Sequence, residues 1–355
     1  MIARWWERRR GSGEESAGTS APTSVGVPVG GTVLVLGVLS VLLCLVSLAV
    51  GSHSLTLEEV AGAFVPGRTT VASVIVWQLR MPRTVLAVMV GASLAVAGVV
   101  MQGLTRNPLA EPGILGINAG ASLSVVLSMS LLGLTDVSDF LWFAFAGAAL
   151  AAFLVHLMSV RSADAGPARL VLAGVALGAS LRSITGTITM YDSVTFDSYR
   201  FWVLGSLADR DAVLLVWVAP FLVVGLVLAL ASGLTLNALV LGEEQAKALG
   251  VSPRRARALA LISITLLCGA STAAVGPISF VGLVVPQVLR LALGADQRRL
   301  LAVSLVAGPV LLLAADVVGR VILDSGEMEA GVVTAFIGGP VLLLMVIQRM
   351  GVKGR

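Results

Sequence analysis

The stretch that decides the fold, Leu79–Ser122, reads LRMPRTVLAVMVGASLAVAGVVMQGLTRNPLAEPGILGINAGAS. It begins with two arginines, continues as an apolar segment, and breaks at Asn107 into a loop rich in glycine and proline. Spacings of four, three and four place several small or polar residues of the segment on one face of a helix: Gly91, Ala95, Gly98 and Gln102. Because small side chains let helices approach closely in lipid, the stretch predicts a tightly packed membrane helix that ends in an elbow.

The composition places the whole chain in a membrane. Of its 355 residues, 57% are hydrophobic and 12% are charged, whereas soluble domains carry about 25% charged residues. The mean hydropathy is +0.97. We therefore predict an all-α polytopic membrane protein surrounded by lipid. The net charge of +4 comes from basic residues spread over short loops, which membrane topology explains and which argues against a nucleic acid partner.

A helix needs about 20 residues to cross the hydrocarbon layer of a bilayer. Ten apolar stretches meet or approach that length, at residues 32–51, 84–104, 113–133, 139–160, 168–190, 212–232, 258–275, 278–293, 300–323 and 331–348. The eighth is short and contains Pro286, which predicts a kinked or half-length helix. We assign residues 31–350 to one transmembrane domain and the polar residues 1–30 to a flexible cytoplasmic tail.

The placement of basic residues predicts the orientation of the chain. Seventeen of the 24 lysines and arginines fall on the side of the N-terminus, and an even number of spans returns the chain to that side. Because basic residues concentrate in cytoplasmic loops, we expect a multi-pass protein of the cell membrane with both termini in the cytoplasm.

The sequence contains no pattern typical of an enzymatic centre or of a bound cofactor. No G-x-x-x-x-G-K-[ST] phosphate-binding loop occurs. Cys44 and Cys268 are the only cysteines, and His53 and His156 are the only histidines. Neither a disulfide framework nor a metal site is therefore predicted.

Several motifs resemble the FecCD-type permease subunits of ABC importers for iron-siderophores and cobalamin. They are NPLAEPGILG after GASLAVAGVVMQ, then GPISFVGLVVPQ, DVVGR and GGPVLLL, and the resemblance extends from about Thr32 to Gln348. It implies a type II ABC importer permease architecture, a second permease subunit that is identical or related, and an external substrate-binding protein. It also implies a dimer of cytoplasmic ATPase subunits that use ATP and Mg²⁺, so that this chain binds no cofactor and catalyses no reaction itself.

The longest predicted cytoplasmic connection is LNALVLGEEQAKALGVSPRRARALA, at residues 236–260. Leu241, Ala246 and Leu249 form a short apolar pattern there, with glutamates on the wet side. The resemblance implies that two short coupling helices, at about residues 237–258, dock in the ATPase subunit through Leu241, Gly242, Glu243, Ala246, Leu249 and Gly250. The alternative is an ordinary basic loop that fixes the topology.

Three arginines lie at predicted outer span ends: Arg80, Arg83 and Arg320. The resemblance implies that they pair with glutamates on the two lobes of the substrate-binding protein. Exposed ion pairs contribute little individually, so several would be needed to orient that protein. Alternatively, the three side chains snorkel toward the membrane surface.

The resemblance also implies a cytoplasmic gate at the elbow. Asn107, Pro108 and Leu109 match the family's gate loop, which faces the loop before the fifth span. That second loop reads GPARL and supplies Pro167 and Ala168, where relatives often carry small hydroxyl residues. The match predicts where the gate lies and leaves the polarity of its second side open.

Arg182 is a charged residue within the fifth predicted span, about 21 Å along the helix from Ala168 at 1.5 Å per residue. Thr185 and Thr189 continue its face. A charge exposed to lipid is costly, so Arg182 should face a partner or a water-filled path. In one interpretation the three residues line a translocation path, and Arg182 attracts an anionic substrate such as a ferric catecholate or carboxylate complex. In the other, Arg182 pairs with a carboxylate such as Asp316 or snorkels outward.

We therefore predict a permease subunit of an ATP-driven importer that takes up ferric siderophores delivered by an external binding protein. Cobalamin or haem is the alternative cargo. An intramembrane enzyme would need clustered catalytic groups, and the spans contain only scattered Arg182, His156 and Asp316. A secondary transporter driven by an ion gradient would need acidic residues near mid-membrane, where Asp316 alone gives little support.

Overall fold

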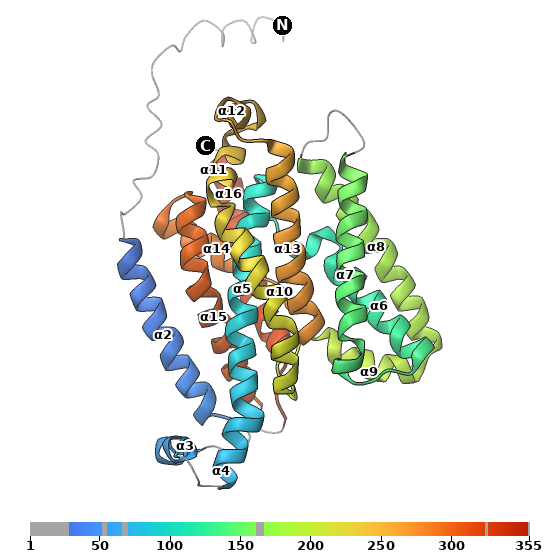
Figure 1. Cartoon of the computed structure of the whole chain (residues 1–355), viewed down its shortest axis with the longest axis vertical. Coiled ribbons are helices and arrows are strands. Elements are labelled where there is room, and N and C mark those ends of the chain that lie inside the picture. Colours follow the sequence, from blue (N-terminus) through green and yellow to red (C-terminus); the bar gives the residue numbers. More distant parts are fainter. Residues whose placement is uncertain (1–27, 52–54, 66–69, 161–166, 324–325, 354–355) are drawn as a thin grey trace, which may run out of the picture.

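The computed structural model describes residues 28–51, 55–65, 70–160, 167–323 and 326–353, so nearly all of the predicted tail lies outside it. Within those residues every regular element is a helix. Figure 1 shows most helices running along the long axis of a bundle. At one end lies α12 (Glu243–Ala248), and at the other lie α3 (Leu57–Ala63) and α4 (Val71–Val74).

Ten apolar helices occupy the ten predicted positions in the described part of the chain. Eight are long and apolar enough to cross a membrane: α2 (Val29–Ala49), α5 (Met81–Thr105), α7 (Val137–Val160), α8 (Pro167–Tyr191), α10 (Ala212–Ala231), α13 (Pro253–Val275), α15 (Gln297–Val321) and α16 (Ala330–Lys353). The other two, α6 (Ile117–Leu132) and α14 (Val281–Leu293), are shorter, and α14 is the helix that contains Pro286. The prediction of an all-helical multi-pass membrane protein is confirmed.

The second membrane helix begins earlier than predicted. It runs without interruption for 35 residues, Val71–Thr105, and includes a π-helical segment, η1 (Ile75–Arg80). Pro82 has no N–H, and in a regular α-helix its ring would clash with the carbonyl four residues earlier. In the wider π turn the Met81 N–H bonds to the Val76 carbonyl, and the helix continues through the proline.

α5 forms the centre of the bundle and is buried along nearly its whole length. Its small-residue face meets two neighbouring helices at backbone distance. A Cβ added to Gly91 would lie 2.7 Å from the Gly308 carbonyl oxygen of α15, and one added to Gly98 would overlap the Gly282 carbonyl of α14. Gln102 on the same face donates a hydrogen bond to the Gly282 carbonyl at 3.3 Å. The close-packing role predicted for this face is confirmed.

Several short elements lie outside or at the edge of the predicted spans, among them α3, η2 (Pro112–Leu115) and α9 (Ser193–Val203). Each is too short to produce a membrane-length apolar pattern. Polar caps position two of them. The Asp192 carboxylate accepts the Thr195 N–H at the start of α9, and Thr56 and Glu59 form a reciprocal capping box on α3.

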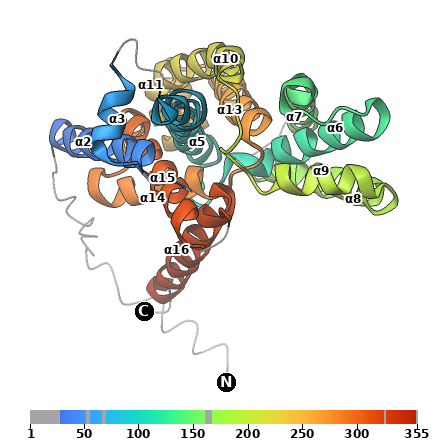
Figure 2. The same ribbon diagram turned by 90° about the horizontal axis from the view of Figure 1, so that it is seen from below.

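Helices α6–α9 form a lobe beside the helices that surround α5 (Figure 2). α6 packs against α7 and α8, and α13 joins the lobe to the rest of the bundle through contacts with α6 and α7. α8 lies at the edge of this lobe, and much of its surface is exposed. A membrane helix in that position is available to contact lipid or a second chain.

Candidate functional site

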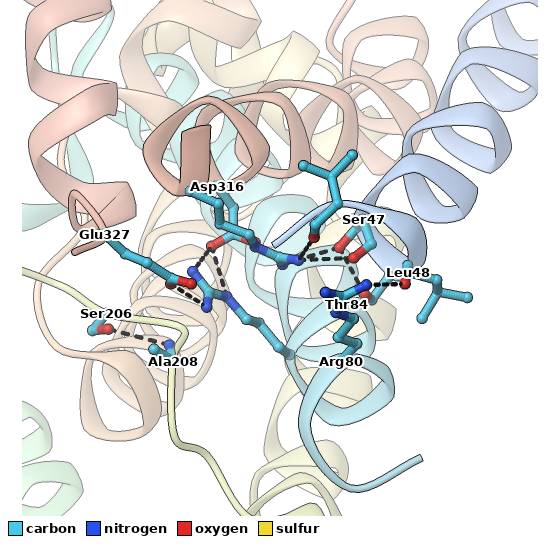
Figure 3. Close-up of polar contacts among 11 residues, drawn as sticks. Ser47, Leu48, Arg80, Thr84, Ser206, Ala208, Asp316 and Glu327 are labelled. Atoms are coloured by element: carbon cyan, nitrogen blue, oxygen red, sulfur yellow. Dashed lines mark hydrogen bonds and ion pairs between the residues drawn. The ribbon is translucent and has the colours of Figure 1, made fainter. Parts of the chain in front are cut away.

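At the end of the bundle that carries α3, predicted to be the outer end, ion pairs surround Asp316 (Figure 3). From α5, Arg83 donates two hydrogen bonds to Asp316 Oδ1, from Nε at 3.0 Å and from Nη2 at 2.9 Å. Arg320, one turn further along α15, donates to the other oxygen. Arg83 Nη1 also donates to Glu327 Oε2 at 2.6 Å. Because Asp316 is only 1% exposed, these arginines rather than water balance its charge.

Two of the predicted docking arginines also hold the end of α2. Arg80 Nη1 donates to the Leu48 carbonyl at 2.7 Å, and Arg320 Nη1 donates to the Ser47 carbonyl at 2.7 Å. Carbonyls in the last turn of a helix have no partner within it, and a cation there also meets the negative end of the helix dipole. Arg80 and Arg320 are 6% and 5% exposed, so the alternative that they snorkel to the membrane surface is wrong. A docking role for the three arginines stays a prediction.

A cavity of about 640 Å³ opens beside this network. Its charged lining residues carry both signs: Arg80, Arg83, Asp209, Arg210, Asp211, Arg320 and Glu327. Arg210 comes from the loop between α9 and α10, and sequence reasoning missed it because nothing in the chain order places that loop beside Arg83. Burial lowers the pKa of Arg210, while nearby Glu329 and Asp209 act to raise it. A lining of mixed charge suits a polar protein surface better than a single small anion.

The predicted gate loop forms a compact turn directly after α5. The side-chain oxygen of Asn107 accepts a hydrogen bond from the Leu109 N–H at 3.0 Å. Asn107 is exposed, whereas Pro108 and Leu109 are half-buried. Of the predicted second side, Pro167 begins α8 and Ala168 is exposed in its first turn, while residues 161–166 lie outside the described part of the chain. The role of these five residues as a gate stays a prediction.

The elbow after the gate loop packs between α8 and α14. Glu111 Oε1 accepts a hydrogen bond from the Phe280 N–H at 2.7 Å, at the start of α14. η2 approaches α8 so closely that a Cβ on Gly174 would overlap the Ile114 carbonyl. Burial raises the pKa of Glu111, and the Phe280 N–H partly opposes that shift. Sequence reasoning missed Glu111, although an acidic residue inside an apolar elbow was a visible signal.

The three predicted path residues of α8, Arg182, Thr185 and Thr189, form a polar stripe that lies in two different environments. Arg182 is exposed, whereas Thr185 is 5% exposed and its hydroxyl donates to the Leu181 carbonyl at 2.9 Å. Thr189, which is half-buried, likewise donates to the carbonyl one turn back at 3.0 Å. The alternative that Arg182 pairs with Asp316 is wrong, because that carboxylate contacts Arg83 and Arg320 instead. A pathway role for the stripe stays a prediction.

Another row of hydroxyls on α8 is exposed along its length. Ser180, Ser183 and Thr187 follow each other at spacings of three and four, which places them on one face of the helix. Ser180 and Thr187 donate to the carbonyls one turn back, at 3.0 and 2.9 Å. Sequence reasoning missed this row even though its spacing was readable. An exposed hydroxyl face suits contact with a second subunit or with a water-filled path better than contact with lipid.

The predicted coupling segment consists of α11 (Gly233–Leu241), α12 and the start of α13. Gly242 and Gly250, with φ of 129° and 77°, form the turns on either side of α12. Glu243 pairs with Arg257 of α13 and fixes α12 against that helix. Of the predicted apolar pattern only Ala246 is buried. Leu241 and Leu249 are 64% and 63% exposed, and their docking role stays a prediction.

Eight membrane-length helices define a polytopic membrane protein, with exposed leucines at one end of the bundle and a charged cavity at the other. The model of the FecCD transport family matches residues 38–348, and the chain belongs to that family. It is 44% identical to the ferric enterobactin transport system permease protein FepD of Escherichia coli, over 85% of this chain and 91% of that protein.

Two further relatives extend the comparison. The chain is 43% identical to the vitamin B12 import system permease protein BtuC of Yersinia pestis, over 78% of this chain and 83% of that protein. It also resembles a solved metal-chelate type ABC transporter in an inward-facing conformation, with a TM-score of 0.79 and 28% identity over 90% of this chain and 99% of the other. The predicted architecture of an ABC importer permease is therefore confirmed.

Proposed function

We propose that this permease imports ferric siderophores across the cell membrane as the transmembrane subunit of an ATP-driven transporter. The assignment of ferric siderophores as the cargo rests on the 44% identity to the permease named for ferric enterobactin. Cobalamin is the second candidate, because identity to the vitamin B12 permease is nearly as high, at 43%. The test is uptake of labelled ferric enterobactin and labelled cobalamin by cells without their own permeases, with and without this chain and its partner subunits. Uptake of neither compound would contradict both candidates.

The proposed transporter contains this permease, a second identical or related permease, an external substrate-binding protein and a cytoplasmic ATPase dimer. ATP and Mg²⁺ are consumed by the ATPase, and both permease termini lie in the cytoplasm. The exposed hydroxyl face of α8 supports pairing of two permeases around a shared path. The mixed charges of the outer cavity support docking of the binding protein, with Arg83 as the contact because its ion pair with Glu327 is partly exposed.

In the proposed cycle, closure of the ATPase dimer on ATP displaces the coupling segment and the helices attached to it. α12 can act as a lever because buried Ala246 and the Glu243–Arg257 ion pair hold it to α13. Displacement of packed helices as rigid bodies is a common way to change access to a central path. The path would then open alternately to the binding protein and to the cytoplasm.

Replacing Leu241 and Leu249 by aspartate is expected to lower recovery of the ATPase with the permease by about tenfold, because two strongly exposed apolar residues beside α12 would carry charge. The measurement is co-purification of the two subunits from membranes. Leu57→Asp is the matched control, since Leu57 is 74% exposed on α3 at the opposite end of the bundle. Equal recovery with the double variant and the control would contradict docking at this segment.

Replacing Arg182 by alanine is expected to raise the apparent KM for uptake of an anionic ferric complex by about tenfold, because a cation beside a narrow path concentrates anions. Uptake kinetics with purified transporter in vesicles provide the measurement. Arg200→Ala is the control, because it removes an exposed cation of α9 that is not among the predicted path residues. An Arg182→Ala variant with normal assembly and unchanged KM would leave Arg182 without a role in the path.

A further inference from the structure

Three stretches that are far apart in the sequence meet at Phe280. Its N–H donates to Glu111 in the elbow after the gate loop, at 2.7 Å. Its side chain lies so close to α16 that a Cβ on Gly338 would overlap it. Phe280 itself begins α14 with a left-handed φ of 70°. A bulky residue rarely adopts that conformation, and it persists where the surroundings fix it. Phe280 is therefore held from two sides, by the elbow and by α16.

Glu111 is well suited to hold the start of α14. The first N–H groups of a helix have no partner within it, and the helix dipole favours a negative charge at that end. Glu111 lies four residues after Asn107, between the gate turn and η2. The carboxylate thus joins the gate loop to a 13-residue helix by a single hydrogen bond. Gln102, just before the gate loop, binds the same helix at the Gly282 carbonyl and at Arg290.

The opposite end of α14 leads to the coupling segment. After α14 the chain turns into α15, which is capped by Asp296. Asn237 of α11 donates to Asp296 Oδ1 at 2.9 Å and accepts from the Gln297 N–H at 2.9 Å. Only five residues separate Asn237 from α12. Hydrogen bonds therefore link the start of α14 to the elbow after the gate loop, and the start of α15 to the coupling segment. The end of α14 is joined to the start of α15 by the three residues 294–296.

We propose that Glu111 is a positioning residue that transmits displacement of the coupling segment to the gate loop through α14. The inference rests on the proposed function, because the displacement is supplied by the ATPase. Glu111 contacts no substrate in this role. Its hydrogen bond makes the gate loop move together with the start of α14. Without that bond the ATPase still hydrolyses ATP, but the gate loop no longer moves in response.

The test follows the exposure of the gate loop directly. In a permease with Cys44→Ser and Cys268→Ala, Asn107→Cys provides a single reporter thiol. Its labelling by a membrane-impermeant maleimide is measured in inside-out vesicles of the assembled transporter, with and without ATP, Mg²⁺ and vanadate. The parent is expected to show a labelling rate that changes with trapping. Glu111→Ala is expected to lose that change and about tenfold of uptake, with ATPase turnover retained, while Glu111→Gln, which keeps the acceptor oxygen, retains both.

Two further variants make the result decisive. Asn237→Ala breaks the link at its other end and is expected to lose the same labelling change, so it decides the question if Glu111→Ala fails to assemble. Glu58→Ala removes an exposed acidic residue of α3, outside the link and outside the cavity, and should leave the change intact. A full labelling change in Glu111→Ala, or in Asn237→Ala when Glu111→Ala cannot be assembled, overturns the inference. A parent transporter with neither ATPase turnover nor a labelling change overturns the proposed function itself.

Discussion

Replacing Asp316 by alanine is expected to destabilise the permease by about 3–5 kcal/mol, because it leaves two arginines in a buried site without their counter-charge. Arg83 and Arg320 both donate to this carboxylate, and Arg320 has only 5% of its surface exposed. The loss should appear as a lower melting temperature of the purified protein in detergent and as less permease in the membrane. Asp316→Asn is expected to cost nearly as much, since it preserves the shape and removes the charge.

Glu327→Ala provides the matched control for that experiment. Glu327 also pairs with Arg83, but its side chain is 29% exposed and water can replace it. Ion pairs accessible to water contribute at most about 1 kcal/mol. If Asp316→Ala melted at the same temperature as Glu327→Ala, the buried charge network would not be what holds the outer end of the bundle together.

Replacing Gly98 by alanine is expected to have the second-largest effect. The added Cβ would overlap the Gly282 carbonyl oxygen, which belongs to backbone and cannot rotate away. α14 would have to move off α5, and overpacking of this kind costs about 1–3 kcal/mol or more. The melting temperature of the purified protein and uptake in cells should both fall, because this contact and the Glu111 hydrogen bond both fix the start of α14.

Gly37→Ala controls for the general effect of alanine in a membrane helix. Gly37 lies on α2, and the nearest atom to an added Cβ is a side-chain carbon of Val306 at 4.0 Å. This change should be neutral or slightly stabilising, since alanine favours helix more than glycine does. A Gly98→Ala variant as stable as Gly37→Ala would mean that α5 and α14 do not make their close backbone contact in the membrane.

Hydropathy predicted the membrane helices well, because a membrane-length apolar pattern needs no knowledge of tertiary contacts. The start of the second helix was predicted too late in the chain. A proline such as Pro82 is tolerated in the first turn of a helix, and nothing in the sequence indicates the π turn that lets the helix continue through it. The resemblance placed Leu241 and Leu249 on a docking surface, and both are exposed in the folded chain. Exposed apolar side chains of this kind are typical of a surface that contacts another protein.

The candidate site was harder to predict, because its partners are distant in the sequence. The sequence pattern of an arginine at the end of a span is identical whether its side chain faces solvent or caps a neighbouring helix. Arg320 contacts Ser47 across 273 positions, which no local pattern reveals. Glu111 and Phe280 lie 169 positions apart, and their contact became visible only in the folded chain. Local spacing did predict the small-residue face of α5, where every member belongs to one helix.

The way α2 is held at one end has a consequence for biosynthesis. α2 is made early, yet the guanidinium groups that satisfy its last carbonyls come from Arg80, about 30 residues later, and from Arg320, more than 250 residues later. Only 11% of its most apolar window is buried, and α2 packs mainly against α15, which is also made late. A nascent chain released before α15 has entered the bilayer therefore contains an α2 that is inserted but not secured. Membrane quality-control proteases that recognise loose helices would then distinguish complete permeases from truncated ones.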